Sequence, residues 1–84
     1  MKPIRLTTHA RQQCAERGAT EEEVVLAVHQ GTREPAKTGR TMCRYNLPYN
    51  REWQAKTYAV KQVAPVVKEE SGEIVVVTVY TFYF

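Results

Sequence analysis

With 84 residues, the chain has the size of one small domain, close to the limit at which a single hydrophobic core suffices without disulfides or metals. Its net charge of +3 and sequence pI near 9.0 permit a polyanionic partner but do not require one. A chain of this length excludes a multi-step enzyme with a large cofactor, so we expect no cofactor and no metal ion.

The positive charge is concentrated in the middle of the chain. Residues 1–30 carry four Lys or Arg and four Glu, residues 31–68 carry eight against two, and residues 69–84 carry none against three. The three segments therefore have net charges of 0, +6 and −3. Contact with a polyanion is expected in the middle segment, although a run of charge is also typical of a solvated face.

Two cysteines, Cys14 and Cys43, lie far apart and form neither a CxxC motif nor a Cys–His pair with metal-binding spacing. We expect both to be buried, reduced thiols of a cytoplasmic protein. No signal peptide and no apolar run of membrane-spanning length is visible, so we expect no membrane partner.

Two helices are predicted in the first third, after a short extended edge strand at residues 3–6. The first helix runs from Thr7 or Thr8 to Arg17 and stops at Gly18 in a left-handed conformation. On this helix His9, Gln13 and Arg17 share one stripe at i, i+4, i+8 spacing.

The second helix has the clearest start signal in the chain. Thr20 and Glu23 form a capping box, and Ala19 can pack against Val24 as a hydrophobic staple. Three glutamates in the first turn suit the helix dipole, and Gly31 ends the helix. Residues 24–28 supply its apolar surface.

The rest of the chain is predicted to form strands. Extended segments are expected at residues 33–37, 41–47, 53–63, 66–69 and 73–84, with turns or loops at 38–40, 48–50 and 70–72. Pro65 is expected to mark a bulge or bend. Two helices followed by such a meander predict one α+β domain over residues 1–84, with both helices packed on one face of an antiparallel sheet.

The last strand, with the sequence EIVVVTVYTFYF, is expected to lie at the centre of the sheet, because it is almost entirely β-branched and aromatic. Strict alternation sends its odd positions to the core, namely Val75, Val77 and Val79. The opposite face then carries Val76, Thr78, Tyr80 and Phe82.

Two segments resemble a known family. The stretch TTHARQQCAERGATEEEVVLAV and the later IVVVTVY are similar to the bacterial family called domain of unknown function 4258, which is grouped with the RelE, ParE and BrnT toxins. This resemblance covers residues 7–31 and 73–81 and implies a RelE-like two-layer fold. It also implies a metal-independent endoribonuclease of the toxin–antitoxin type, which would act on RNA such as ribosome-associated mRNA and would bind an antitoxin protein.

The resemblance further implies that His9, Arg17, Thr78 and Tyr80 are the polar site positions. Metal-free RNA cleavage needs a base for the 2′-hydroxyl, an acid for the leaving oxygen and cations against the phosphate. His9 can exchange protons, Arg17 can hold phosphate through two bonds, and Tyr80 can donate a proton or a hydrogen bond.

Three basic residues of the middle segment are candidates for gripping the nucleic-acid backbone, namely Arg40, Arg44 and Lys61. Each assignment has a structural alternative. His9 can be a structural histidine, Arg17 can bond the last helical carbonyls, and Thr78 and Tyr80 can simply favour a strand.

Two other functions stay open at the level of sequence. The first is a non-catalytic module that binds nucleic acid or protein on the same fold. The second is a homodimer or antitoxin interface formed by the aromatic tail, which consists of Tyr80, Phe82, Tyr83 and Phe84.

Overall fold

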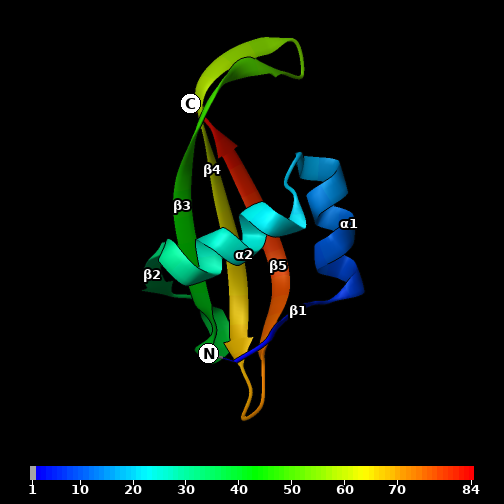
Figure 1. Ribbon diagram of the computed structural model, residues 1–84, viewed down its shortest axis with the longest axis vertical. Coiled ribbons are helices and arrows are strands. Elements are labelled where there is room, and N and C mark those ends of the chain that lie inside the picture. The colour runs from blue at the N-terminus through cyan, green and yellow to red at the C-terminus, as the bar shows by residue number, and fades with distance from the viewer. Residues whose placement is uncertain (1) are drawn as a thin grey trace.

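The computed structural model describes residues 2–84 and consists of two helices on one face of a five-stranded sheet (Figure 1). The elements, in chain order, are β1 (Ile4–Leu6), α1 (Thr8–Arg17), α2 (Glu21–Gln30), β2 (Thr32–Pro35), the 3₁₀ turn η1 (Lys37–Gly39), β3 (Thr41–Trp53), β4 (Lys56–Glu69) and β5 (Ile74–Tyr83). The strand order is β1-β5-β4-β3-β2. The predicted α+β class is therefore confirmed.

The sheet is mixed, so the expectation of a purely antiparallel sheet was wrong. β1 pairs in parallel with β5, with Ile4 opposite Ile74, whereas all other neighbours are antiparallel.

Arg5 in β1 donates two hydrogen bonds of 3.0 and 2.9 Å to the Glu73 carboxylate. These bonds lower the pKa of Glu73 below its usual value. At pH values above the ordinary pKa of a glutamate, the pair therefore helps to hold β1 in place. Its contribution to stability is lost as the pH falls through the lowered pKa of Glu73.

Both helices start and end where the sequence predicts. The Thr7 side chain accepts a hydrogen bond from the Ala10 amide at 3.1 Å, and Gly18 ends α1 with φ of 76°. Thr20 and Glu23 form both bonds of the capping box, each 3.0 Å long. The predicted caps are therefore confirmed.

Replacing Thr20 with alanine is expected to lower the free energy of unfolding by about 1 kcal/mol, because the first turn of α2 loses an acceptor for one of its free amides. Denaturant unfolding measures the change. Thr8→Ala is a suitable control, since Thr8 is exposed and the neighbouring Thr7 caps α1. A loss within about 0.2 kcal/mol for Thr20→Ala would contradict the assignment of the cap.

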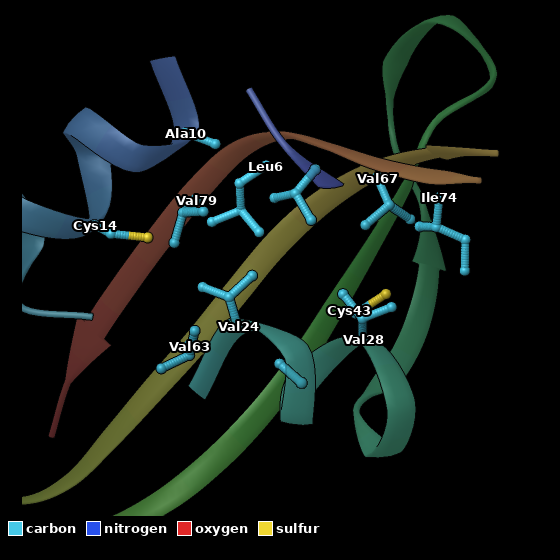
Figure 2. Close-up of a cluster of buried hydrophobic side chains, with 12 residues drawn as sticks. Leu6, Ala10, Cys14, Val24, Val28, Cys43, Val63, Val67, Ile74 and Val79 are labelled. Carbon is cyan, nitrogen blue, oxygen red and sulfur yellow. The ribbon is translucent and has the colours of Figure 1, made fainter. Parts of the chain in front are cut away.

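The core lies between the helices and one sheet face (Figure 2). The helices contribute small side chains such as Ala10 and Ala27, which let them approach the sheet closely. The sheet contributes mainly valines from β4 and β5, whereas β3 contributes Cys43. Both cysteines are free and buried in this core, and burial raises the pKa of each thiol. The prediction that Cys14 and Cys43 are buried thiols is confirmed.

The hairpin of β3 and β4 is longer than the sequence suggests, and it projects beyond the helices (Figure 1). The expected loop at residues 48–50 is wrong, because β3 continues through it with a shift of register between Pro48 and Arg51. The turn falls instead at Gln54 and Ala55, which have φ of 51° and 67°. Two residues in the left-handed region match the right-handed twist of a hairpin, although the sequence carries no glycine there to signal it.

β5 contains a bulge that reverses its side-chain alternation. Val66 of β4 pairs with Thr78, and Val67 pairs with Val76, so Val77 is an extra residue in β5. Val76 therefore joins Val79 in the core, and the prediction that it shares a face with Thr78 was wrong. A strict period of two cannot anticipate an inserted residue.

The expected bend at Pro65 was wrong, because β4 runs unbroken through Pro65, which lies opposite Val79. The register shift falls between Val66 and Val67, opposite the extra residue Val77 of β5. β4 is also the middle strand, so the placement of residues 73–84 at the centre was wrong. β5 is an inner strand whose outer neighbour is only the three-residue β1.

The turn between β2 and β3 holds Thr38 and Gly39 in left-handed conformations, with φ of 61° and 72°. The Arg40 amide donates to the Lys37 carbonyl at 3.3 Å, which closes the turn. This arrangement resembles a type I′ turn, in which Asn-Gly is the favoured pair. A β-branched threonine at such a φ is strained.

Replacing Thr38 with asparagine is expected to raise the free energy of unfolding by about 0.5 to 1 kcal/mol, because asparagine tolerates the left-handed region. Thermal or denaturant unfolding would measure this gain. The control is Thr32→Asn in the neighbouring strand β2, where the substitution is expected to give no gain. Equal effects in the two variants would show that the strain is not at Thr38.

Candidate nucleic-acid interface

Helix α1 closes the edge of β5 where β1 ends. β1 pairs with β5 only as far as Val76, and beyond that residue the side chains of α1 bond the free edge of β5. The buried side chain of Gln13 accepts a hydrogen bond from the Val79 amide at 2.8 Å, and Arg17 donates to the Val79 carbonyl at 2.8 Å. Both backbone groups of this edge residue are thus satisfied without another strand.

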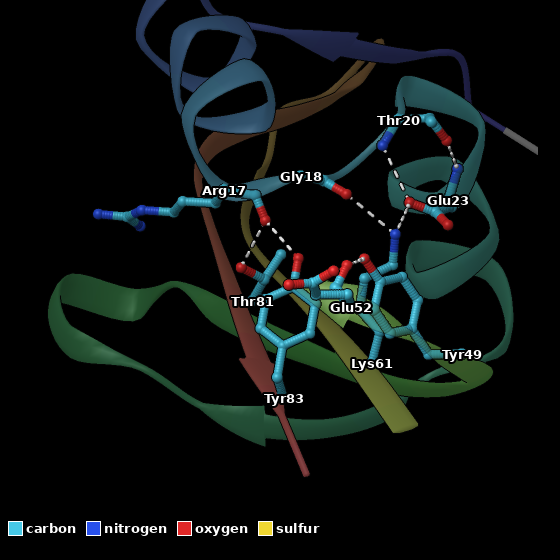
Figure 3. A network of polar contacts seen from close by, with 9 residues as sticks. All are labelled: Arg17, Gly18, Thr20, Glu23, Tyr49, Glu52, Lys61, Thr81 and Tyr83. Atoms are coloured by element: carbon cyan, nitrogen blue, oxygen red, sulfur yellow. Dashed lines mark hydrogen bonds and ion pairs between the residues drawn. The ribbon is translucent and has the colours of Figure 1, made fainter. Parts of the chain in front are cut away.

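The C-terminal end of α1 is fixed to β5 by a second pair of bonds. The Thr81 and Tyr83 hydroxyls donate to the Arg17 carbonyl at 2.9 and 2.7 Å. Figure 3 shows that the Arg17 guanidinium points away from this network. The backbone of Arg17 is therefore anchored on the helix side, and its side chain is directed toward the strand edge.

On the face opposite the helices, two arginines flank two exposed aromatic rings. The Arg17 Cζ lies 5.1 Å from the centroid of the Tyr80 ring, and the Arg44 Cζ lies 5.4 Å from that of Phe82. The Tyr80 and Phe82 centroids are 6.4 Å apart, and their planes differ by 21°. We call these four residues the arginine–aromatic row. Tyr80 is 39% exposed and Phe82 is 38% exposed, so both rings are open to a ligand.

Arg44 is held in position by neighbours on the same face. It forms an ion pair with Glu34 of β2, and its Nη1 donates to the Gln62 side chain at 2.9 Å. Gln62 in turn donates to Asn46 at 2.8 Å. Since these bonds fix the guanidinium, Arg44 loses little side-chain entropy when it meets a ligand.

A pocket of about 500 Å³ adjoins this row, between β5, β4, β3 and the turn η1. Four of the predicted site residues line it, namely Arg40, Arg44, Thr78 and Tyr80. Chain segments 34 or more residues apart in the sequence thus meet at one surface, and the structure brings these four predictions together.

The other three predicted site residues lie elsewhere. His9 is exposed near the start of α1 and is not among the pocket residues. Arg17 lies eight positions further along the helix, or about 12 Å along the axis. Arg17 contacts Tyr80 but does not line the pocket. Its side chain bonds a strand carbonyl rather than the last carbonyls of its own helix.

Lys61 faces the helices and is only 4% exposed. Its ammonium donates to the Gly18 carbonyl at 2.9 Å and to the Glu23 carboxylate at 2.8 Å (Figure 3). It also lies over the Tyr49 ring, 5.4 Å from the centroid. Lys61 therefore joins the turn between the helices to β4 and is not available on the open face.

Sequence reasoning gave Phe82 a role only in a dimer or antitoxin interface and gave no individual role to Glu34 or Lys37, although all three belong to this surface. The sequence did place Phe82 on the same strand face as Tyr80, because it lies two residues later in the same strand. The contribution of Glu34 depends on its pairing with Arg44 across two strands, which no local pattern shows.

The fold and this surface define a small α+β domain that carries both helices on one sheet face and an exposed arginine–aromatic surface on the other. No family model, no curated protein and no solved structure matches the chain. Within residues 2–84, no helix is long and apolar enough to cross a membrane. The same residues contain no cluster of three His, Cys, Asp or Glu side chains that could hold a metal ion.

Proposed function

We propose that this protein binds single-stranded RNA on the open face of its sheet. The observation that carries the proposal is the arginine–aromatic row, in which two neighbouring rings are exposed between two guanidinium groups. Unpaired bases stack on aromatic side chains and on the planes of arginines, and cations attract the backbone phosphates. An open sheet face is a rigid support for such stacking.

The charge of the surface favours a polyanion over a second copy of the chain. Arg17, Lys37 and Arg40 form no ion pair with a carboxylate among residues 2–84. In a symmetric dimer built on this face, two copies of the same cationic surface would face each other, and their like charges would repel. RNA instead supplies both the planar bases and the negative charge.

Binding is tested by fluorescence anisotropy with a labelled single-stranded RNA of about ten nucleotides, at two salt concentrations. Replacing Tyr80 and Phe82 together by alanine is expected to raise the Kd by about tenfold or more, since each stacked base contributes about 1 to 3 kcal/mol. Both residues are exposed, so the fold should survive. Single-stranded DNA of the same sequence shows whether the 2′-hydroxyl matters.

The matched control is Arg51→Ala. Arg51 also lies over a tyrosine ring, 4.8 Å from the Tyr49 centroid, but on the projecting hairpin. This variant removes an equivalent arginine–tyrosine contact away from the proposed surface, so its Kd should stay within about twofold of the native value. A Kd unchanged by the double alanine substitution, or no salt-sensitive binding at all, would reject the proposal.

Cleavage of the bound RNA is the second candidate function, and the resemblance to the RelE-like toxins supports it. The specific observation in its favour is that Thr78 and Tyr80, which both carry hydroxyls, line one pocket together with Arg40 and Arg44. In this second proposal, Tyr80 exchanges a proton while the arginines stabilise charge on the phosphate.

Cleavage is tested with purified protein and single-stranded RNA in EDTA, with and without ribosomes. Products should end in 2′,3′-cyclic phosphate, and Tyr80→Phe should lower the rate by about 10²-fold. Tyr45→Phe is the control, because Tyr45 packs against the core on the helix side. RNA that is bound but uncut would reject the cleavage function and leave RNA binding as the only proposed function.

His9→Ala tests the assignment of His9 as the base in the same assay. A loss of about 10²-fold would mean that the reacting phosphate reaches α1. An unchanged rate would remove His9 from the site.

A protein partner, such as an antitoxin, would compete for the same surface. The exposed aromatic residues of the tail are Tyr80, Phe82 and Phe84, whereas Tyr83 stacks on Trp53 with a centroid distance of 5.1 Å. Light scattering over a range of concentrations measures self-association. A stable dimer that dissociates on replacing Phe82 and Phe84 by alanine would favour the interface function over RNA binding.

A further inference from the structure

The pocket beside the arginine–aromatic row combines three kinds of surface. Its apolar portion includes Met42 and Val66 together with the ring of Tyr80. Its cations are Lys37, Arg40 and Arg44, and its single carboxylate, Glu34, is paired with Arg44. Hydroxyl groups come from Thr38 and Thr78.

The cations on the turn side of the pocket have no carboxylate to neutralise them. Neither Lys37 nor Arg40 forms an ion pair within residues 2–84. Both flank the strained turn at Thr38 and Gly39, which forms one wall of the pocket. Strained backbone persists where the surrounding structure holds it, often at binding sites. Two unpaired cations beside a tight turn suit an anionic group with several acceptor oxygens, such as a phosphate.

The size of the pocket points to a small planar ligand rather than to a phosphate alone. A volume of about 500 Å³ lies within the range of about 300 to 1,000 Å³ that is usual for small-molecule sites. The apolar floor provides a surface for a base, and the cationic wall provides one for a phosphate.

We propose that this pocket binds one whole nucleotide, with its phosphate at Lys37 and Arg40 and its base against Met42, Val66 and Tyr80. This inference deepens the proposed RNA binding and rests on it, because the nucleotide would be a terminal one whose neighbours continue onto Phe82. The ligand class is thus a phosphate-terminated single strand, for which a nucleoside monophosphate is the smallest analogue.

The test is a titration of the full chain with 5′-AMP, adenosine and ribose 5-phosphate, followed by backbone amide shifts in NMR. AMP should bind at least about tenfold more tightly than either fragment, because charge-assisted bonds to phosphate contribute about 1.5 to 3 kcal/mol and adenosine lacks them. The shifts should include Thr38, Thr78 and Tyr80. Adenosine or ribose 5-phosphate binding as tightly as AMP would overturn the proposal.

The variant Lys37→Ala/Arg40→Ala should weaken AMP binding by about tenfold or more. Its control is Arg51→Ala/Lys56→Ala, which removes the same charge from the projecting hairpin, where both residues are exposed. Equal losses in the two double variants would show that the effect is only net charge and would overturn the pocket assignment.

The two proposals fail in different ways. If RNA binds through Tyr80 and Phe82 but AMP does not bind, the pocket proposal is rejected and the proposed function stands. If AMP binds and shifts the pocket residues but RNA does not bind, RNA binding and the assignment to a strand end are rejected, and the pocket is a site for a free nucleotide.

Discussion

Replacing Gly18 with alanine is expected to lower the free energy of unfolding by about 3 kcal/mol. Two causes add. Gly18 has φ of 76°, where a side chain costs about 1 to 2 kcal/mol. A β-carbon there would also lie 2.7 Å from Trp53 and from the Tyr83 hydroxyl, so the aromatic cluster would have to move.

Gly39 provides a control that separates these causes. Its φ is 72°, but no atom lies within 4 Å of a β-carbon built on it. Gly39→Ala should therefore cost only the conformational component, about 1 to 2 kcal/mol. Denaturant unfolding of both variants gives the steric component as the difference. Equal losses would show that the Trp53 and Tyr83 side chains move aside without a cost in stability, and that the contact at Gly18 is not tightly packed.

Replacing Lys61 with methionine is expected to lower the free energy of unfolding by about 2 to 3 kcal/mol. Methionine keeps most of the buried stem but leaves the Gly18 carbonyl without its donor and removes the partner of Glu23. The loss stays below that for a fully buried ion pair, because the Glu23 side chain is 24% exposed and can still be hydrated.

Lys68→Met is the matched control, since Lys68 belongs to the same strand but has a side chain that is 55% exposed. Its effect should lie within about 0.5 kcal/mol. The double variant Lys61→Met/Glu23→Gln measures the coupling between the two charges in a double-mutant cycle. A neutral result for Lys61→Met would mean that the ammonium does not hold the helix turn to β4.

The contacts of Lys61 with Gly18 and Glu23 explain why it belongs to the scaffold rather than to the nucleic-acid surface. The sequence shows a lysine in a basic segment, and a basic segment is expected to be exposed. In the fold, the same strand position faces the helices, opposite the Gly18 turn. Which face a strand residue takes depends on register, and register is decided by partners far away in the sequence.

Local signals in the sequence were sufficient for both helices. The caps at Thr7 and Thr20 and the stop at Gly18 depend on contacts within three or four residues, so the sequence alone determines them. The turn at Gly39 follows for the same reason, because glycine tolerates the left-handed region. The α+β class followed from the order of these elements.

The arrangement of the strands was decided only by the tertiary structure. The parallel pairing of β1 depends on the return of β5 about 70 residues later, and the extra residue Val77 depends on the packing of β5 against β4. Because of that bulge, Val76 enters the core together with Val79, while Tyr80 and Phe82 lie on the open face as strand alternation predicts. The sequence determined which residue types were present, but the long-range pairing of strands determined which of them meet, because each pairing forms between segments that have no local influence on one another.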